Sequence, residues 1–138
     1  MDSQCSPIRV LIMLPAYNEA ESISNLLDRI IETLEPFDMI DFEIIVIDDG
    51  SSDATAVHVR RMDVKLIRHI KNLGPGVAVR SGYKYACRNT FDYVIRLDGD
   101  GQHPPEMIPD LLNPLLNDDA DVVLGSRHLS DEEYTTSL

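Results

Sequence analysis

Two carboxylates lie two residues apart in the segment Asp98-Gly99-Asp100-Gly101-Gln102, directly after an apolar run. If the backbone stays extended there, side chains two residues apart point the same way, so Asp98, Asp100 and Gln102 converge on one spot. Two carboxylates about 4 Å apart repel each other by roughly 4 kcal/mol at an effective dielectric constant near 20. A shared proton or a bound divalent cation would offset this repulsion. An all-oxygen ligand set favours Mg²⁺ or Mn²⁺, which commonly has a phosphate as its other partner.

The same aspartates have a simpler alternative role, which is to cap the following helix and form a turn. Gly99 and Gly101 would then supply the unusual backbone angles. Two features favour the metal site over this alternative. Gln102 continues the two-residue spacing of Asp98 and Asp100, and a second acidic pair follows another predicted strand. That pair, Asp48 and Asp49, either forms a turn or accepts hydrogen bonds from a nucleobase imide N–H or from ribose hydroxyls.

The elements that must position these residues alternate between strand and helix along the chain. The predicted strands cover residues 8–14, 42–47, 64–67, 91–97 and 121–124, and the predicted helices cover residues 18–34, 51–61, 77–88 and 104–116. Asn18 is the predicted N-cap of the first helix, and Ser51 or Ser52 is that of the second. Pro109 and Pro114 predict a break or kink in the last helix.

Strand and helix alternating in this way predict an α/β fold, a Rossmann-like and mostly parallel sheet with helices on both faces. In such sheets, ligands bind beyond the carboxyl ends of the strands. Polar segments follow the predicted strands at residues 15–19, 48–51, 98–100 and 125–127. All four segments should therefore meet at one edge of the sheet and form one site.

Several other polar residues have two open interpretations. Tyr17 is either an aromatic residue at the edge of the core or a ring that stacks on a nucleobase. Glu19 is either an acid in the first helical turn or a ribose partner. Arg80 and Arg127 are the basic residues best placed to bind a diphosphate or an anionic acceptor. For Arg80 an exposed helix position is favoured, and for Arg127 the site and surface interpretations are equal.

The length and composition indicate one folded domain. The chain has 138 residues, of which 43% are apolar. Its 12 Lys and Arg residues against 24 Asp and Glu give a net charge of −12, which disfavours nucleic acid and anionic lipid as partners. Cys5 and Cys87 have no metal or redox spacing, which predicts free thiols in a reducing compartment. With no secretory leader and no apolar run long enough to span a bilayer, we expect a cytoplasmic chain without a membrane span.

Five segments carry a resemblance to a known family, and in chain order they are Leu14-Pro-Ala-Tyr-Asn-Glu-Ala-Glu, Val46-Ile-Asp-Asp-Gly-Ser-Ser-Asp, Asn72-Leu-Gly-Pro-Gly, Asp98-Gly-Asp-Gly-Gln-His-Pro-Pro-Glu and Val123-Leu-Gly-Ser-Arg. Together they resemble family 2 glycosyltransferases with the GT-A fold, especially the dolichyl- or polyprenyl-phosphate sugar synthase branch. The resemblance predicts a nucleotide-sugar-binding domain over residues 1–129, incomplete at its C-terminal side. Residues 130–138 are acidic and have no apolar periodicity, which predicts a frayed tail. In a full-length form, such a protein would work at the cytoplasmic face of a membrane.

The resemblance implies a nucleotide-diphospho-sugar donor, Mg²⁺ or Mn²⁺, and inverting transfer of the sugar to a lipid-phosphate or glycan acceptor. The residues that match donor nucleotide-binding positions are Pro15, Tyr17, Glu19, Ile47, Asp49, Asp98, Gly99 and Asp100. The implied metal ligands are Asp98, Asp100 and Gln102, and Arg127 matches a position that faces the acceptor phosphate.

The chain departs from the family pattern in two respects. Many relatives carry a lysine where Pro75 stands, which removes one phosphate contact. The family's second half, with its acceptor-side acidic residues, is absent, so no general base is predicted. We therefore expect the donor-binding part of an enzyme, inactive alone. The alternatives are a non-catalytic nucleotide-binding or assembly module that self-associates as a homo-oligomer, and a nucleotidyltransferase.

Overall fold

The computed structural model describes residues 5–124 of the chain. In chain order its elements are β1 (Ile8–Ala16), α1 (Ile23–Leu34), β2 (Ile40–Asp48), α2 (Thr55–Arg60), β3 (Lys65–Arg68), α3 (Pro75–Asn89), β4 (Tyr93–Arg96), a 3-10 turn (Pro105–Met107) and α4 (Ile108–Leu116). The chain divides into two compact units between Glu106 and Met107, and the first unit contains the whole sheet.

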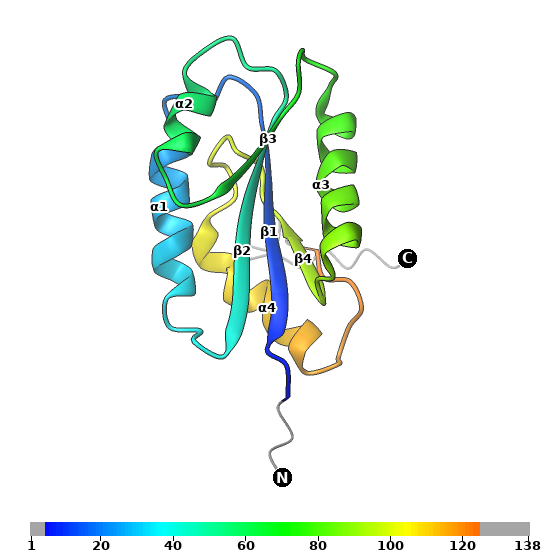
Figure 1. Cartoon of the computed structure of the whole chain (residues 1–138). Coiled ribbons are helices and arrows are strands. Elements are labelled where there is room, and N and C mark those ends of the chain that lie inside the picture. Colours follow the sequence, from blue (N-terminus) through cyan, green and yellow to red (C-terminus); the bar gives the residue numbers. More distant parts are fainter. Residues whose placement is uncertain (1–4, 125–138) are drawn as a thin grey trace, which may run out of the picture. The chain divides into compact units, whose positions relative to one another are not determined.

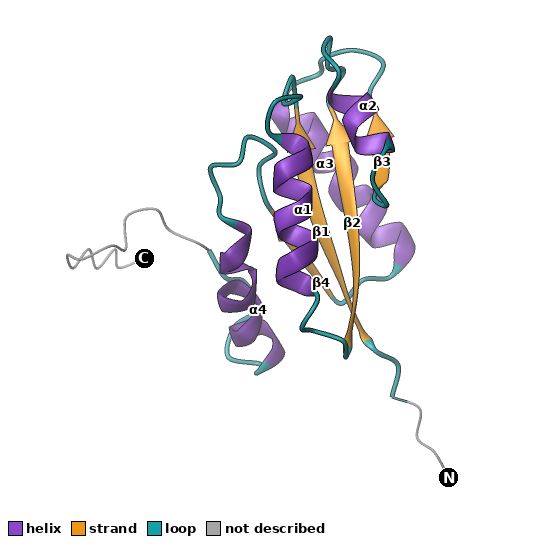
Figure 2. Cartoon of the chain, turned by 90° about the vertical axis from the view of Figure 1, so that its left-hand side faces the viewer, coloured by secondary structure: helices purple, strands orange, loops and turns teal. Residues whose placement is uncertain are grey.

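The four strands form one parallel sheet in the order β3-β2-β1-β4 (Figure 1). Strand β1 is central, because it pairs with β2 along its full length and with β4 through Val10–Met13. Helices α1 and α2 lie on one side of the sheet and α3 lies on the other, as the two views together show (Figures 1 and 2). The predicted parallel α/β architecture with helices on both faces is confirmed.

The middle of β1 is a continuous apolar run because both of its faces are covered. Residues 10–14 have no exposed surface. Leu11 and Met13 pack beneath α3 in a cluster that also contains Ile45, Ile47, Ala78 and Ala86. Helix α3 lies close to the sheet at Gly82, where a Cβ atom would lie only 2.6 Å from Met13 Sδ.

Both predicted helix caps are wrong. Helix α1 begins at Ile23, whereas Asn18 has a left-handed backbone with a φ of 52°. Asn18 instead joins two loops: its N–H donates to Ser51 Oγ and its Oδ1 accepts from the Ser52 N–H, each over 2.9 Å. The two serines are used in these contacts, and α2 begins at Thr55 without a side-chain cap. Short polar side chains that bond a distant loop are not free to cap their own helix.

The predicted fifth strand over residues 121–124 is also wrong. The structure has no strand in this segment, and Val122 and Leu124 are 74% and 86% exposed. Their apolar character alone predicted the strand, but a strand is defined by backbone pairing with a neighbour. The preceding helix, α4, contains Pro109 in its first turn and Pro114 in its interior. Within residues 5–124, no helix has the length and apolar character needed to cross a membrane.

Candidate functional site

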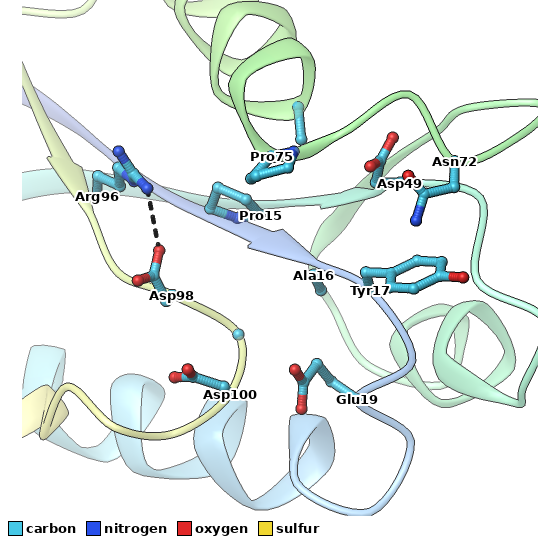
Figure 3. Close-up of a pocket in the computed structure, with 12 residues that line it drawn as sticks. Pro15, Ala16, Tyr17, Glu19, Asp49, Asn72, Pro75, Arg96, Asp98 and Asp100 are labelled. Atoms are coloured by element: carbon cyan, nitrogen blue, oxygen red, sulfur yellow. Dashed lines mark hydrogen bonds and ion pairs between the residues drawn. The ribbon is translucent and has the colours of Figure 1, made fainter.

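A cavity of about 380 Å³ lies at the carboxyl end of the sheet (Figure 3). Its lining residues come from the ends of β1, β2 and β4 and from the start of α3. They are Pro15, Ala16, Tyr17, Glu19, Asp49, Asn72, Pro75, Ala78, Arg96, Asp98, Gly99 and Asp100. The structure therefore brings together every residue predicted to bind the donor nucleotide, with the exception of Ile47.

Two predicted site residues do not line this cavity. The Ile47 side chain is fully buried in the cluster beneath α3, so it is unavailable to a ligand. Gln102 is exposed and does not line the cavity. Arg127 lies outside the described residues. Arg80 is exposed on α3, as its favoured interpretation predicted.

The acidic segment is a turn and does not continue β4, which ends at Arg96. Asp100 Oδ1 accepts a hydrogen bond from the Gln102 N–H over 2.9 Å, and Gly101 has a φ of 75°. An aspartate that bonds the backbone two residues on forms a turn of its own. The predicted extended geometry, with three side chains pointing the same way, is therefore wrong. Asp98 and Asp100 still line the same cavity (Figure 3).

Gly99 holds this turn against the end of β1. Its N–H donates to the carbonyl of Pro15 over 3.0 Å, and a Cβ atom at Gly99 would lie 2.9 Å from the Cβ of Ala16. One step earlier, the Leu97 N–H donates to the Met13 carbonyl over 3.0 Å. These two hydrogen bonds, which lie beyond the end of β4, tie the start of the turn to β1 and fix the carboxylates beside the cavity.

The cavity has a strongly negative lining. Burial is the largest cause that raises the pKa of Glu19, and the nearby charges of Asp100 and Asp53 raise it further, against a hydrogen bond from Ser22. Arg96 is the one cationic side chain among the lining residues, with its guanidinium 3.3 Å from Asp98 Oδ1. Carboxylates grouped in this way favour a bound cation.

The donor set suits a hard divalent ion that is shared with a ligand. In residues 5–124, no three His, Cys, Asp or Glu side chains are grouped so that they alone could hold a metal. Asp98 and Asp100 offer carboxylate oxygens, which Mg²⁺ and Mn²⁺ prefer. Ions of this kind are often held by one or two carboxylates together with the phosphates of a substrate. The residues present therefore fit a metal that binds together with a diphosphate.

On the other side of the cavity, Asp49 is fixed by three donors. Its Oδ1 accepts from His69 Nδ1 over 2.8 Å and from the Leu73 N–H over 3.0 Å, and its Oδ2 accepts from the Gly74 N–H over 2.9 Å. His69 Nε2 lies 2.8 Å from Ser81 Oγ of α3, so the imidazole links the carboxylate to this helix. The carboxylate thereby holds the loop that precedes α3.

These contacts determine the charge of Asp49. Burial acts to raise its pKa, but the hydrogen bonds from His69, Leu73 and Gly74 outweigh burial and lower the pKa. Because the pKa in the folded state lies below that in the unfolded state, the ionised group stabilises the fold at neutral pH. This contribution is lost as the pH falls through the folded-state pKa. At neutral pH, Asp49 is an acceptor only.

Substitutions of His69 test the link to Asp49. The amide nitrogen of Asn is as many bonds from Cβ as Nδ1 of His, and that of Gln is as many as Nε2. We expect His69→Gln, which loses the donor to Asp49, to unfold in urea with about 2 kcal/mol less free energy than His69→Asn, because hydrogen bonds to charged groups are strong. Equal stability of the two variants would show that the imidazole does not support Asp49.

The loop that carries Tyr17 and Glu19 is held by a second aspartate, Asp53. Its Oδ1 accepts from the N–H and the hydroxyl of Thr55, and its Oδ2 accepts from the Ala20 N–H over 3.2 Å. The Thr55 hydroxyl oxygen in turn accepts from the Glu19 N–H over 2.9 Å. The start of α2 thus positions the residues that follow β1.

Sequence reasoning missed several functional neighbours. Arg96, Asn72 and Ala78 line the cavity, and His69 supports Asp49. A signal existed for Asn72, since it begins one of the five segments that carry the family resemblance. For Arg96 the only signal was its position two residues before Asp98, which does not distinguish a strand residue from a cavity residue.

A parallel sheet with paired carboxylates and an anchored loop at its carboxyl edge is consistent with the α/β domain of a GT-A glycosyltransferase, and comparisons with known proteins show that class. The family model of glycosyl transferase family 2 matches residues 11–137. The chain belongs to this family.

Several of the matching relatives are named as transferases of dolichyl or undecaprenyl phosphate. Dolichol-phosphate mannosyltransferase of Pyrococcus furiosus is 36% identical over 126 residues, which cover 88% of this chain and 34% of the relative. Undecaprenyl-phosphate mannosyltransferase of Micrococcus luteus is 32% identical, with 88% of this chain and 49% of the relative covered. The chain thus spans about a third to a half of the length of these relatives.

A solved structure gives the same fold. The mannosyltransferase PcManGT from Pyrobaculum calidifontis, in complex with GDP-Man and Mn²⁺, superposes with a TM-score of 0.61 at 29% identity. The match covers 75% of this chain and 30% of that chain. The expected GT-A fold and the family resemblance are both confirmed.

Proposed function

We propose that this chain binds the nucleotide-diphospho-sugar donor of a glycosyltransferase, together with Mg²⁺ or Mn²⁺. The observation that carries the proposal is that Asp98 and Asp100 line the same cavity as Tyr17 and Asp49. One cavity thus offers two carboxylates that can bind a metal ion with its diphosphate. Beside them it offers an aromatic ring for the base and a carboxylate that can accept a hydrogen bond from the nucleoside. The metal ion and the donor nucleotide in the PcManGT complex support the assignment.

Each part of the cavity has a distinct role in this proposal. Asp98 and Asp100 would hold the metal, which supplies Lewis-acid stabilisation to the departing nucleoside diphosphate when bound. Arg96, paired with Asp98, orients that carboxylate and adds positive charge near the phosphates. Tyr17, which is 44% exposed, offers a ring face on which the base stacks.

Asp49 would select the base. Three donors already bind its carboxylate, which has about four acceptor sites, so one site is left for a ligand. An ionised carboxylate accepts hydrogen bonds but cannot donate them. Asp49 therefore favours uracil, with its N3–H, or guanine, with its N1–H. It disfavours adenine and cytosine, because adenine N1 and cytosine N3 carry no hydrogen.

For the acceptor, we propose a polyprenyl phosphate and transfer with inversion. A sugar hydroxyl would need a general base to remove its proton, whereas a phosphate oxygen is already a nucleophile. The names of the matching relatives support a lipid phosphate. The free thiols of Cys5 and Cys87 suit a reducing compartment, so we place the protein at the cytoplasmic face of a membrane.

Thermal unfolding with a panel of UDP, GDP, ADP and CDP tests the donor site. We expect UDP or GDP with Mn²⁺ to stabilise the chain, by about 2.7 kcal/mol at a ligand concentration one hundred times Kd, and the same ligand with EDTA to have little effect. Stabilisation by no nucleotide, or equally by all four with EDTA, would contradict the proposal.

A transfer assay with the preferred donor and a polyprenyl phosphate separates an enzyme from a binding module. Formation of a lipid-linked sugar establishes the glycosyltransferase activity. Tight metal-dependent binding with neither transfer nor donor hydrolysis assigns this span to donor binding alone.

A further inference from the structure

Half of the chain's positive charges lie in one segment that contains no acidic residue. Residues 64–91 hold six of the 12 Lys and Arg residues and none of the 24 Asp and Glu, the six being Lys65, Arg68, Lys71, Arg80, Lys84 and Arg88. The segment has a charge of +6, and the remaining six basic and 24 acidic residues give −18. The total of −12 hides this separation. Composition therefore does not exclude anionic lipid as a partner of this segment.

Three of these cations lie along the outer face of α3. Arg80, Lys84 and Arg88 follow one another at the i, i+4 spacing, and all three are exposed. The buried residues of this helix are Ala78, Gly82 and Ala86. Helix α3 covers one face of the sheet (Figure 1), and its three cations lie on the side of the helix opposite to these buried residues.

Arg88 lies in the last turn of α3, where a cation is favourable, but the spacing of the three cations does not stabilise the helix. Like charges at the i, i+4 spacing repel one another. Among the residues that the structure describes, Arg80, Lys84 and Arg88 have no acidic partner, although acidic residues outnumber basic ones in the whole chain. Three unpaired cations on an acidic protein indicate a binding role rather than a structural one.

Apolar and aromatic side chains lie among the cations. A groove of about 450 Å³ on this face is lined by Arg80, Lys84 and Arg88 together with Val79, Tyr83 and Cys87. Tyr83 is 48% exposed, Val77 of the same helix is 40% exposed, and Ile70 in the preceding loop is fully exposed. Exposed apolar and tyrosine side chains next to Lys and Arg are typical of segments that lie on an anionic bilayer.

We propose that the outer face of α3, formed by Arg80, Tyr83, Lys84, Cys87 and Arg88, docks on an anionic lipid bilayer. Complementary charge selects this partner, and the same bilayer repels the acidic remainder of the chain, so the molecule binds in one orientation. The first turns of α3 line the donor cavity through Pro75 and Ala78, so docking would hold that cavity near the lipid surface. The docking itself does not depend on nucleotide binding.

Co-sedimentation with phosphatidylcholine vesicles, with and without phosphatidylglycerol, tests the proposal. We expect binding only to the anionic vesicles, and weaker binding at high salt. Each cation near an anionic surface strengthens binding roughly fivefold, so Lys84→Gln/Arg88→Gln should weaken it about 25-fold. The matched control, Arg60→Gln/Arg61→Gln, removes two exposed cations at the end of α2 and should change binding by less than about threefold.

A fluorescent label reports the docked face without changing its charges. Cys87 lies in the groove and is exposed, so an environment-sensitive dye on Cys87 in a Cys5→Ser background should shift to the blue with anionic vesicles. The same dye on Met39→Cys, in a Cys5→Ser/Cys87→Ser background, should not shift, since Met39 is 81% exposed and lies outside this segment.

Three results would overturn the proposal. The first is no binding to anionic vesicles, and the second is equal weakening by both pairs of substitutions. The third is a vesicle-independent change of sedimentation coefficient that Lys84→Gln/Arg88→Gln abolishes, because this would assign the face to an acidic protein surface such as a second copy of the chain.

Discussion

Asp100→Asn should weaken the binding of the preferred nucleoside diphosphate in Mn²⁺ by at least about 100-fold. Loss of a residue that only supports a metal ligand already costs roughly 10- to 100-fold, and Asp100 is proposed to be a ligand itself. The neutral amide is a much weaker ligand for Mn²⁺, which is the group that offsets the charge of the diphosphate, so the difference between Mn²⁺ and EDTA should disappear. Isothermal titration in both conditions measures the effect.

Asp28→Asn is the matched control for this experiment, since it removes the same charge from an exposed position on α1. It should leave nucleotide affinity and metal dependence unchanged. If the nucleotide binding of Asp100→Asn still depends fully on Mn²⁺, Asp100 is not a metal ligand and the metal assignment of the acidic turn is wrong.

Gly50→Ala should destabilise the chain by about 3 kcal/mol or more, which lowers Tm by roughly 10 °C. Gly50 has a φ of 71°, and a Cβ atom there would lie 2.3 Å from the carbonyl carbon of Lys71. The backbone of Lys71 cannot move freely, because the loop that it begins is bonded to Asp49. The substitution therefore combines backbone strain with a clash that the fold cannot relieve cheaply.

Gly101→Ala separates the two causes. Gly101 has a similar φ of 75°, but a Cβ atom there would meet no other atom within 4 Å. Only the left-handed backbone strain, which costs about 1–2 kcal/mol, should therefore destabilise this variant. Urea and thermal unfolding of both variants, followed by circular dichroism, give the comparison. If Gly50→Ala lowers the free energy of unfolding no more than Gly101→Ala does, the backbone at Lys71 can move away from the added Cβ atom at little cost.

The sequence predicted the frame of the fold because that frame depends on local pattern. The continuous apolar run of β1 requires a strand covered on both faces, and the apolar spacing of Ile23, Leu26, Leu27 and Ile30 requires a helix with one buried side. Strands and helices that alternate leave few topologies, and all of them bring the strand ends to one edge. The location of the cavity follows from this frame.

The rest of the site depends on contacts between distant residues. Asn18 resembles an N-cap, yet its side chain bonds Ser52, which only the folded chain brings near. The bond from His69 to Asp49 crosses between two strand ends in the same way. The shape of the acidic turn depends on one backbone hydrogen bond to Asp100, which no periodicity reveals. Residues 121–124 show the opposite error, since their apolar pattern predicted a strand that the structure does not contain.

The place of β1 in the sheet also sets the order of events during synthesis. Val10 of β1 pairs with Tyr93 of β4, which is separated from it by more than half of the chain. At roughly 5–20 residues per second, a ribosome needs about 4–17 s to reach β4 after making β1. Throughout that interval one side of the most apolar strand lacks its neighbour. The nascent chain is therefore most exposed to aggregation before β4 emerges, and chaperones that bind short apolar segments should act on β1 in this period.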